Sequence, residues 1–158
     1  MTKEEVYQIL DTVMDPEIPV LSLVKMGIIR DVRVEQEQVE VDLVPTFAGC
    51  PAIEMMRQDV IKRVEEAGAR SVQVNVLFKQ AWSTNQMSPA GKTKLKEFGI
   101  SPPPAFDGEL TLEVLEKVSC PRCGSDNTQL MNSFGPTACR SIHHCNDCKE
   151  TFEQMKPL

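Results

Sequence analysis

The sequence lacks the features of a nucleic-acid or membrane protein. Asp and Glu outnumber Lys and Arg by 23 to 17, and neither residues 1–118 nor residues 119–158 hold a basic excess. Nucleic-acid binders present a basic face that releases phosphate counterions, so we expect no nucleic-acid partner. No apolar run approaches the roughly 20 residues of a membrane span, and the first residues lack the basic and apolar segments of a secretion signal. We therefore expect a cytoplasmic protein without membrane contact.

Histidine is scarce, whereas cysteine is not. The chain has 2 histidines and 6 cysteines among its 158 residues. Without a secretion signal, cysteines stay reduced, so metal ligation or thiol reactivity is expected in place of a disulfide framework.

The first hundred residues predict a small α/β domain. Apolar residues recur at helical spacing over residues 3–14, where Asp15-Pro16 should end the helix, and again from Pro51 to Gly68. Alternating apolar residues predict strands over 27–35, 38–45 and 70–78. The order α-β-β-α-β predicts a two-layer fold with a three-stranded sheet. A right-handed crossover should make the third strand parallel to the second.

A proline-containing linker should separate this domain from the rest of the chain. A short basic helix is expected over residues 88–98, and Ser101-Pro102-Pro103-Pro104 follows it. We predict three regions: an α/β domain over 1–100, a linker over 101–118 and a small C-terminal ribbon over 119–158.

Four cysteines in two close pairs predict a zinc ribbon. Cys120 and Cys123 form one pair, and Cys145 and Cys148 form the other, with 21 residues between the pairs. A tight turn between paired cysteines points both sulfurs at one ion, and four thiolates favour tetrahedral zinc, although iron or an iron–sulfur cluster uses similar ligands. Four protein ligands leave no open position, so we expect a structural ion.

Three further residues of the ribbon are open to more than one interpretation. His143 is either a replacement ligand or, together with His144, part of an exposed pair on a loop, and the exposed pair is favoured. Cys139 is either a buried small hydrophobe or a spare thiolate that serves redox chemistry or metal transfer.

Cys50 stands between a predicted strand and a predicted helix. Pro51 suits the first helical position, which would make Cys50 the N-cap residue. The helix dipole and unpaired N–H groups would then lower the pKa of the thiol and favour a nucleophile or a soft-metal ligand. An inertly packed cysteine is an equally good interpretation of the sequence. A Cys–His hydrolase would need a histidine from the ribbon.

Several segments together resemble a known family. The first are Asp15-Pro16-Glu17-Ile18-Pro19, residues 27–29 and residues 46–51, which resemble the small α/β domain of SufT-like iron–sulfur assembly factors. Residues 82–88, 99–103 and 134–140, with the four-cysteine ribbon, resemble the PaaD family, also called PaaJ, of accessory subunits in the phenylacetyl-CoA epoxidase system. The resemblance covers essentially the whole chain.

The resemblance implies an accessory, non-catalytic role in aerobic phenylacetate breakdown. Such proteins are thought to help install or maintain the iron–sulfur cluster of the reductase subunit, which with the other epoxidase subunits would be the partner. By resemblance, Cys50 and Cys139 are reactive thiols or transient ligands of iron or a cluster, and the ribbon cysteines bind zinc. Lys25-Met26 and Asn85 depart from the family pattern, because each lacks an expected acid.

Three hypotheses follow from the sequence. The first is an assembly factor that uses Cys50, and the second is a structural subunit that holds the oxygenase together through its ribbon. The third and weakest is a thiol enzyme that uses Cys50.

Overall fold

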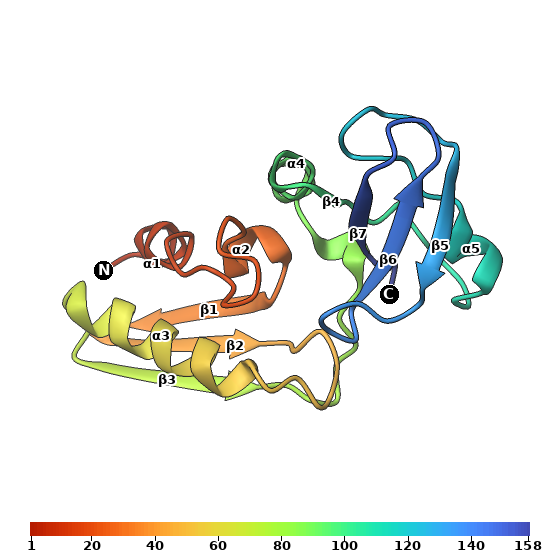
Figure 1. The fold of residues 1–158 in the computed structure, drawn as a ribbon. Helices are drawn as coiled ribbons and strands as arrows, with labels where there is room; N and C mark the ends of the chain where they lie inside the picture. Colours follow the sequence, from red (N-terminus) through yellow and green to blue (C-terminus); the bar gives the residue numbers. More distant parts are fainter. The chain divides into compact units, whose positions relative to one another are not determined.

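The computed structural model describes all of residues 1–158, which divide into two compact units (Figure 1). The first unit holds residues 1–82 and 86–88, and the second holds residues 83–85 and 89–158. None of the helices has the length and apolar character needed to cross a membrane.

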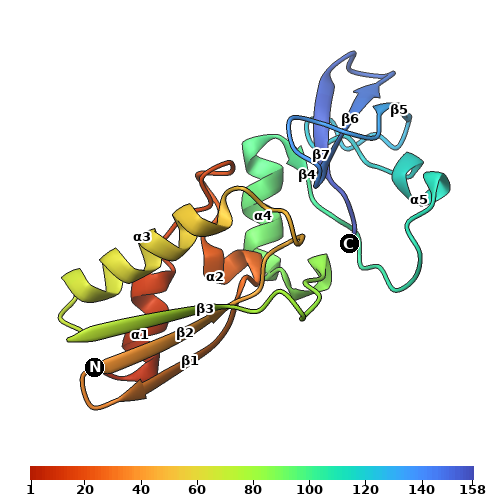
Figure 2. The ribbon, with the colours of Figure 1, turned by 90° about the horizontal axis from the view of Figure 1, so that it is seen from below.

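The first unit is built around a three-stranded sheet, with order β1-β2-β3 (Figure 2). Its elements are α1 (Lys3–Leu10), α2 (Leu23–Met26), β1 (Ile29–Glu35), β2 (Gln38–Leu43), α3 (Ile53–Glu66) and β3 (Ser71–Val76). β1 and β2 form an antiparallel hairpin whose turn places Gln36 at φ 56°, and β3 lies parallel to β2. The predicted α/β class, hairpin and parallel third strand are confirmed.

One face of this sheet forms the core of the first unit. Val39, Val41 and Leu43 of β2 are buried, as alternation in a strand requires. Helices α1 and α3 contact each other, and each contacts a neighbouring strand, so they cover the same face. The buried stripe of α3 is Met56, Val60 and Val64.

The opposite face holds a network of charged and polar side chains. Arg33 of β1 donates two hydrogen bonds to Asp42, at 2.7 and 2.8 Å, and one to Glu40, at 3.0 Å. Asn75 of β3 donates to both carboxylates. The hydrogen bond from Arg33 is the largest cause that holds the pKa of Asp42 below its usual range.

The first helix is shorter than predicted. It ends at Leu10 rather than at residue 14, because Thr12 and Val13 bond to carbonyls only three residues back, in a tighter turn. Asp15 therefore does not stop the helix. It is 4% exposed, and its Oδ1 accepts from the N–H groups of Glu17 and Ile18, at 2.8 and 2.9 Å.

The short helix α2 was not predicted, and two interactions explain it. Ser22 caps its first turn by accepting from the N–H of Lys25, and the Lys25 ammonium pairs with Asp11. Gly27 ends it in the left-handed conformation, at φ 76°, where a Cβ would lie 2.6 Å from the carbonyl oxygen of Gln86. Glycine is required here both for its backbone and for its lack of a side chain.

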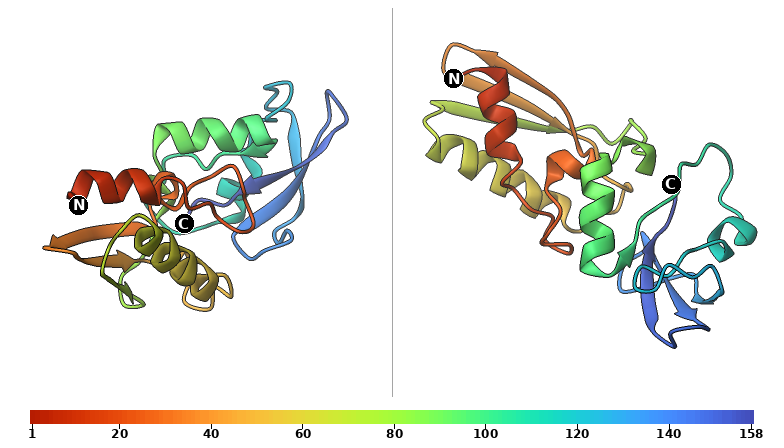
Figure 3. Two further views of the ribbon diagram at one scale, coloured as in Figure 1. Left: turned by 90° about the vertical axis from the view of Figure 1, so that its left-hand side faces the viewer. Right: turned by 90° about the horizontal axis from the view of Figure 1, so that it is seen from above.

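The second unit contains a four-stranded sheet with order β4-β7-β6-β5. Its elements are η1 (Thr84–Gln86, shared with the first unit), α4 (Pro89–Phe98), β4 (Ile100–Ser101), α5 (Leu112–Glu116), β5 (Thr128–Asn132), β6 (Arg140–Cys145) and β7 (Thr151–Met155). α4 ends at Gly99, as predicted, and leads directly into β4 (Figure 3).

The compact units differ from the predicted regions 1–100, 101–118 and 119–158. The basic helix α4 belongs to the second unit rather than to the α/β domain. Residues expected in a linker also form part of the ribbon unit, because Ser101 pairs with Gln154 of β7 and residues 112–116 form α5. The prolines after Ser101 predicted a linker, and they gave no sign that Ile100 and Ser101 form the edge strand β4.

Candidate metal centre and the Cys50 site

Two turns of the same geometry present the four ribbon cysteines. In the first turn, the N–H of Gly124 donates to the carbonyl of Cys120 at 2.9 Å. In the second, the N–H of Lys149 donates to the carbonyl of Cys145 at 3.0 Å. The donor residue is left-handed in both turns, with φ 74° at Gly124 and 64° at Lys149. The sequence revealed only the glycine, because a lysine gives no signal for this backbone conformation.

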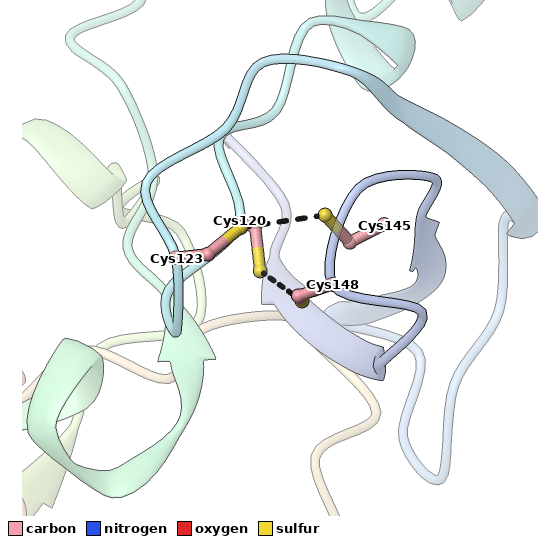
Figure 4. A group of neighbouring side chains, drawn as sticks. All are labelled: Cys120, Cys123, Cys145 and Cys148. Atoms are coloured by element: carbon pink, nitrogen blue, oxygen red, sulfur yellow. Dashed lines mark hydrogen bonds between the residues drawn. The ribbon is translucent and has the colours of Figure 1, made fainter.

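The four sulfurs converge on one point (Figure 4). They all lie within 4.8 Å of one another, with 3.7 Å between Cys120 and Cys148 and 3.5 Å between Cys123 and Cys145. Thiolates at about 2.3 Å from a tetrahedral ion are about 3.8 Å apart, and a disulfide needs about 2 Å. The spacing therefore fits a single ion. An iron–sulfur cluster would separate its cysteines further, because several iron atoms lie between them.

The electrostatics of these sulfurs also favour a cation. The N–H of Cys148 donates to Cys145 and is the main reason that the pKa of Cys145 falls to about 7. At Cys148 the N–H of Glu150 donates to the sulfur, but burial and the three neighbouring cysteines raise its pKa to about 12. Four adjacent sulfurs cannot all ionise without a positive charge between them, and a divalent ion supplies that charge.

The two histidines are not an exposed pair on a loop. Both lie on β6, and His143 is fully buried, stacks on Phe152 at 5.6 Å and contacts the hydroxyl of Ser141 at 2.9 Å through Nε2. Burial lowers the pKa of His143 to about 4. His143 is therefore a core residue of the ribbon. Its burial was not predicted because strand β6 was not predicted.

Cys139 lies outside the four-cysteine group. It is 7% exposed, its sulfur is 3.0 Å from the hydroxyl of Thr137, and its carbonyl accepts from the N–H of Lys156. The structure thus places Cys139 where the buried interpretation of the sequence expected it, beside β7.

Cys50 is not the N-cap of a helix. α3 begins at Ile53 with Ala52 as its cap residue, and Cys50 belongs to the preceding turn, where its N–H donates to the carbonyl of Phe47 at 3.1 Å. Burial raises the pKa of the Cys50 thiol. The predicted cap position and the predicted lowering of the pKa are therefore wrong: Cys50 lies two residues before the cap residue Ala52, and burial outweighs the hydrogen bond that the N–H of Ala52 donates to the sulfur.

Two carboxylates lie close enough to Cys50 to influence it. After burial, the charges of Glu17 and Asp15 raise the pKa of the thiol further, while the N–H of Ala52 and the hydroxyl of Thr46 oppose the change by hydrogen bonding to the sulfur. The sequence predicted only that Asp15-Pro16 ends the first helix, and it assigned no separate role to Glu17 or Thr46. The fold brings these residues to one half-buried cysteine, and no local pattern could reveal that.

Two different family models match two separate parts of the chain. Residues 3–76 match the family model described as iron–sulfur cluster assembly protein, and residues 107–156 match the PaaD zinc beta ribbon domain. A protein of Escherichia coli (strain K12), provisionally named as one of the subunits of 1,2-phenylacetyl-CoA epoxidase, is 36% identical over 152 residues, which are 96% of this chain and 91% of the relative. This chain belongs to the PaaD family.

Other relatives match only the first part of this PaaD-family chain. An Fe-S protein maturation auxiliary factor of Porphyromonas gingivalis is 35% identical over 89 residues, covering 55% of this chain and 84% of the relative. A crystal structure of a domain of unknown function from Bacillus anthracis has a TM-score of 0.55 at 27% identity, covering 59% of this chain and 90% of that one. The first unit thus has the iron–sulfur assembly fold, and the ribbon sets the PaaD family apart from these relatives.

Proposed function

We propose that this PaaD-family chain is an accessory factor of a phenylacetyl-CoA epoxidase system that helps to assemble or maintain the iron–sulfur cluster of the reductase subunit. Cys50 would transiently bind iron or the edge of a cluster, which is cargo rather than a resident cofactor. The observation that supports this proposal is the placement of one half-buried thiol among Glu17, Asp15 and Thr46.

The electrostatics of this site suit a metal cation better than a nucleophilic thiolate. Carboxylates near Cys50 disfavour ionisation of the free thiol, which argues against a thiol enzyme. The same negative charges attract a divalent cation, which would displace the thiol proton when it binds. A single sulfur with nearby carboxylate and hydroxyl oxygens is also an incomplete set of ligands, so a bound ion could pass to another protein.

The ribbon would hold a structural zinc through Cys120, Cys123, Cys145 and Cys148. Zinc bound there supplies charge compensation and folding energy rather than catalysis, because the four sulfurs complete its tetrahedral coordination. Val118 and Phe152 pack with Cys120 and Cys145 in a small core, so the ion and this core would stabilise one another.

The test is the cluster content of the client. A Cys50→Ser variant and the unchanged chain would be co-expressed with the reductase subunit, and iron and acid-labile sulfide per reductase would be measured after purification without oxygen. Cys139→Ser makes the same atomic change at the other cysteine outside the ribbon group, for which the resemblance also implies a reactive role. We expect a several-fold loss of cluster for Cys50→Ser and none for Cys139→Ser, because Cys139 is buried; a loss for Cys139→Ser would assign that thiol to the mechanism as well.

An unchanged cluster content for Cys50→Ser would remove Cys50 from the mechanism. If that variant also co-purified with the epoxidase subunits at fixed stoichiometry, the chain would instead be a structural subunit of the oxygenase. Purified chain, loaded with zinc and titrated with ferrous iron in the absence of oxygen, gives an independent readout: Cys50→Ser should bind at least one iron fewer than the unchanged chain.

A further inference from the structure

The four ribbon cysteines differ in their exposure to solvent, and each turn contributes one cysteine of each kind. In the first turn Cys120 is buried and Cys123 is exposed, and in the second turn Cys145 is buried and Cys148 is exposed. An oxidant in solution therefore meets one sulfur of each turn first. The buried sulfur is shielded from the oxidant, but it remains available for a reaction with a neighbouring sulfur.

The exposed sulfur of each turn lies beside the buried sulfur of the other turn (Figure 4). The distance is 3.5 Å between the sulfurs of Cys123 and Cys145 and 3.7 Å between those of Cys120 and Cys148. A disulfide needs about 2 Å between its sulfurs, so each of these pairs would have to approach by less than about 2 Å to form one. Both disulfides would cross between the turns, and each would join an exposed cysteine to a buried one.

Hydrogen bonds that do not involve sulfur also hold the two turns together. The carboxylate of Asp147, in the second turn, accepts from the hydroxyl of Ser125 and, at 3.0 Å, from the side-chain nitrogen of Asn127. Asn146 donates to the oxygens of Asn127 through its backbone, at 2.9 Å, and through its side chain, at 3.0 Å. These bonds would keep the turns side by side after an ion has left, which favours disulfides between the turns over disulfides within a turn.

We propose that the ribbon is a peroxide-sensitive switch, in which oxidation replaces the zinc ion by the disulfides Cys123–Cys145 and Cys120–Cys148. This switch rests on the proposed zinc ligation by the same four cysteines. The exposed thiolate attacks hydrogen peroxide, the O–O bond breaks, and a sulfenic acid and a hydroxide ion form. The buried thiolate of the other turn then attacks the sulfenic sulfur, so that the S–S bond forms and a second hydroxide ion leaves.

The electrons and protons of this reaction balance without a further reactant. Each disulfide passes two electrons from its two sulfurs to one molecule of hydrogen peroxide, and two protons from solvent convert the two hydroxide ions to water. Two molecules of peroxide therefore oxidise all four thiolates, and the zinc ion leaves as a hydrated divalent cation. The crossed disulfides connect the same two turns that the ion connects, so the ribbon keeps its fold while it loses its metal. Disulfides within the turns would leave the turns unconnected.

The test adds hydrogen peroxide stepwise to the full, zinc-loaded chain. A colorimetric chelator would follow the release of zinc, and mass spectrometry would map the disulfides after alkylation of the remaining thiols. Amide NMR spectra would show whether strands β5 to β7 persist. Asp147→Ala removes the two hydrogen bonds that this carboxylate accepts from the other turn. Asp126→Ala is the matched control, because it makes the same change at an exposed aspartate that accepts from Ser119, in the segment of the first turn itself.

We expect zinc to be released as peroxide is added, the two crossed disulfides to form, and the strands to persist. Dithiothreitol followed by zinc should restore the starting state. The ratio of disulfides within the turns to crossed disulfides should rise roughly fivefold in Asp147→Ala and stay the same in Asp126→Ala.

The outcomes separate the switch from the zinc site on which it rests. A chain that holds no zinc before oxidation would overturn the proposed zinc site and the switch with it. In a chain that holds zinc, the switch alone is overturned if peroxide leaves the zinc bound or if the strands are lost. Disulfides within the turns of the unchanged chain, disulfides to Cys50 or Cys139, or the same connectivity in both aspartate variants would overturn the switch as well.

Discussion

Asn85 occupies a position at which the family pattern has an aspartate, and its side-chain hydrogen bonds give a test of what stabilises the second unit. Its side-chain nitrogen donates to the carbonyl of Phe106 at 2.6 Å and to the carboxylate of Asp107 at 3.3 Å. Its side-chain oxygen accepts from the N–H of Phe106 at 3.0 Å. An asparagine meets all three contacts, and an aspartate meets only the last. We therefore predict that Asn85→Asp destabilises the second unit.

The size of the effect follows from these distances. The lost hydrogen bond to the Phe106 carbonyl is worth about 1 kcal/mol. Two carboxylates about 3.3 Å apart repel by about 1.3 kcal/mol in bulk water. The N–H of Phe106 would gain about 0.5 to 1 kcal/mol from a charged acceptor. The net cost is about 1.5 kcal/mol, equivalent to roughly 6 to 12 °C in the melting temperature of a unit of this size.

Thermal unfolding of the zinc-loaded chain, followed by circular dichroism at low and high salt, measures this cost. Asn85→Ala is the control, because it removes the three hydrogen bonds without adding charge. The cost of Asn85→Asp should shrink at high salt, where the repulsion is screened, and that of Asn85→Ala should not. If Asn85→Asp melts with the unchanged chain at low salt, or if its cost does not depend on salt, the reasoning fails.

Three further predictions concern the first unit. Gly27→Ala should cost at least about 2 kcal/mol of unfolding free energy in urea, because its Cβ would lie 2.6 Å from a backbone oxygen and the backbone is left-handed; a cost below about 1 kcal/mol would contradict this close approach. Glu17→Gln should speed alkylation of Cys50 near pH 8, because the Glu17 charge contributes to the raised pKa of the thiol; an unchanged rate would show that the carboxylate is too distant. Asp42 has a lowered pKa in the folded chain, so it contributes stability above the ordinary pKa of an aspartate, about 3.9, that is lost as the pH falls through the lowered value. Arg33→Met should flatten this acid limb of the stability curve, and an equally steep limb in that variant would refute the assignment.

The elements that the sequence predicted well are those whose signal is local. β2 alternates along its own length and α3 repeats every three to four residues, so both could be identified without knowledge of their neighbours. The two cysteine pairs likewise predict a shared ion. The two-residue spacing within each pair lets a tight turn direct both sulfurs toward one ion. The early end of α1 was missed because it depends on a competing turn, and α2 because it depends on Asp11, eleven residues before the serine that caps it.

The site around Cys50 was only half predictable. The sequence singled out the cysteine itself but assigned it to the wrong position, since Pro51 suits a turn as well as the first residue of a helix. The neighbouring residues come from the loop after α1 and from the segment that follows β2, and the fold brings the two segments together. The expected low pKa failed because burial, which is the largest cause of the raised pKa, and the nearby charges of Glu17 and Asp15 both depend on the fold.

The two sulfur sites differ in a way that suits holding a metal at one and releasing it at the other. In the ribbon, four sulfurs can complete the coordination of one ion, so that the ion is held by all four even though the pKa of Cys145 is lowered and that of Cys148 is raised. At Cys50 a single thiol is kept protonated by burial and by nearby carboxylates, so an incoming cation must displace a proton and finds too few ligands to be retained. Because one thiolate competes with protons less well than four do, iron binding at the proposed Cys50 site should be lost at a higher pH than zinc binding in the ribbon, which metal analysis across a pH series would measure. The proposed role in iron–sulfur assembly requires this difference, because an ion that stabilises the ribbon must not exchange with an ion that would pass to a client.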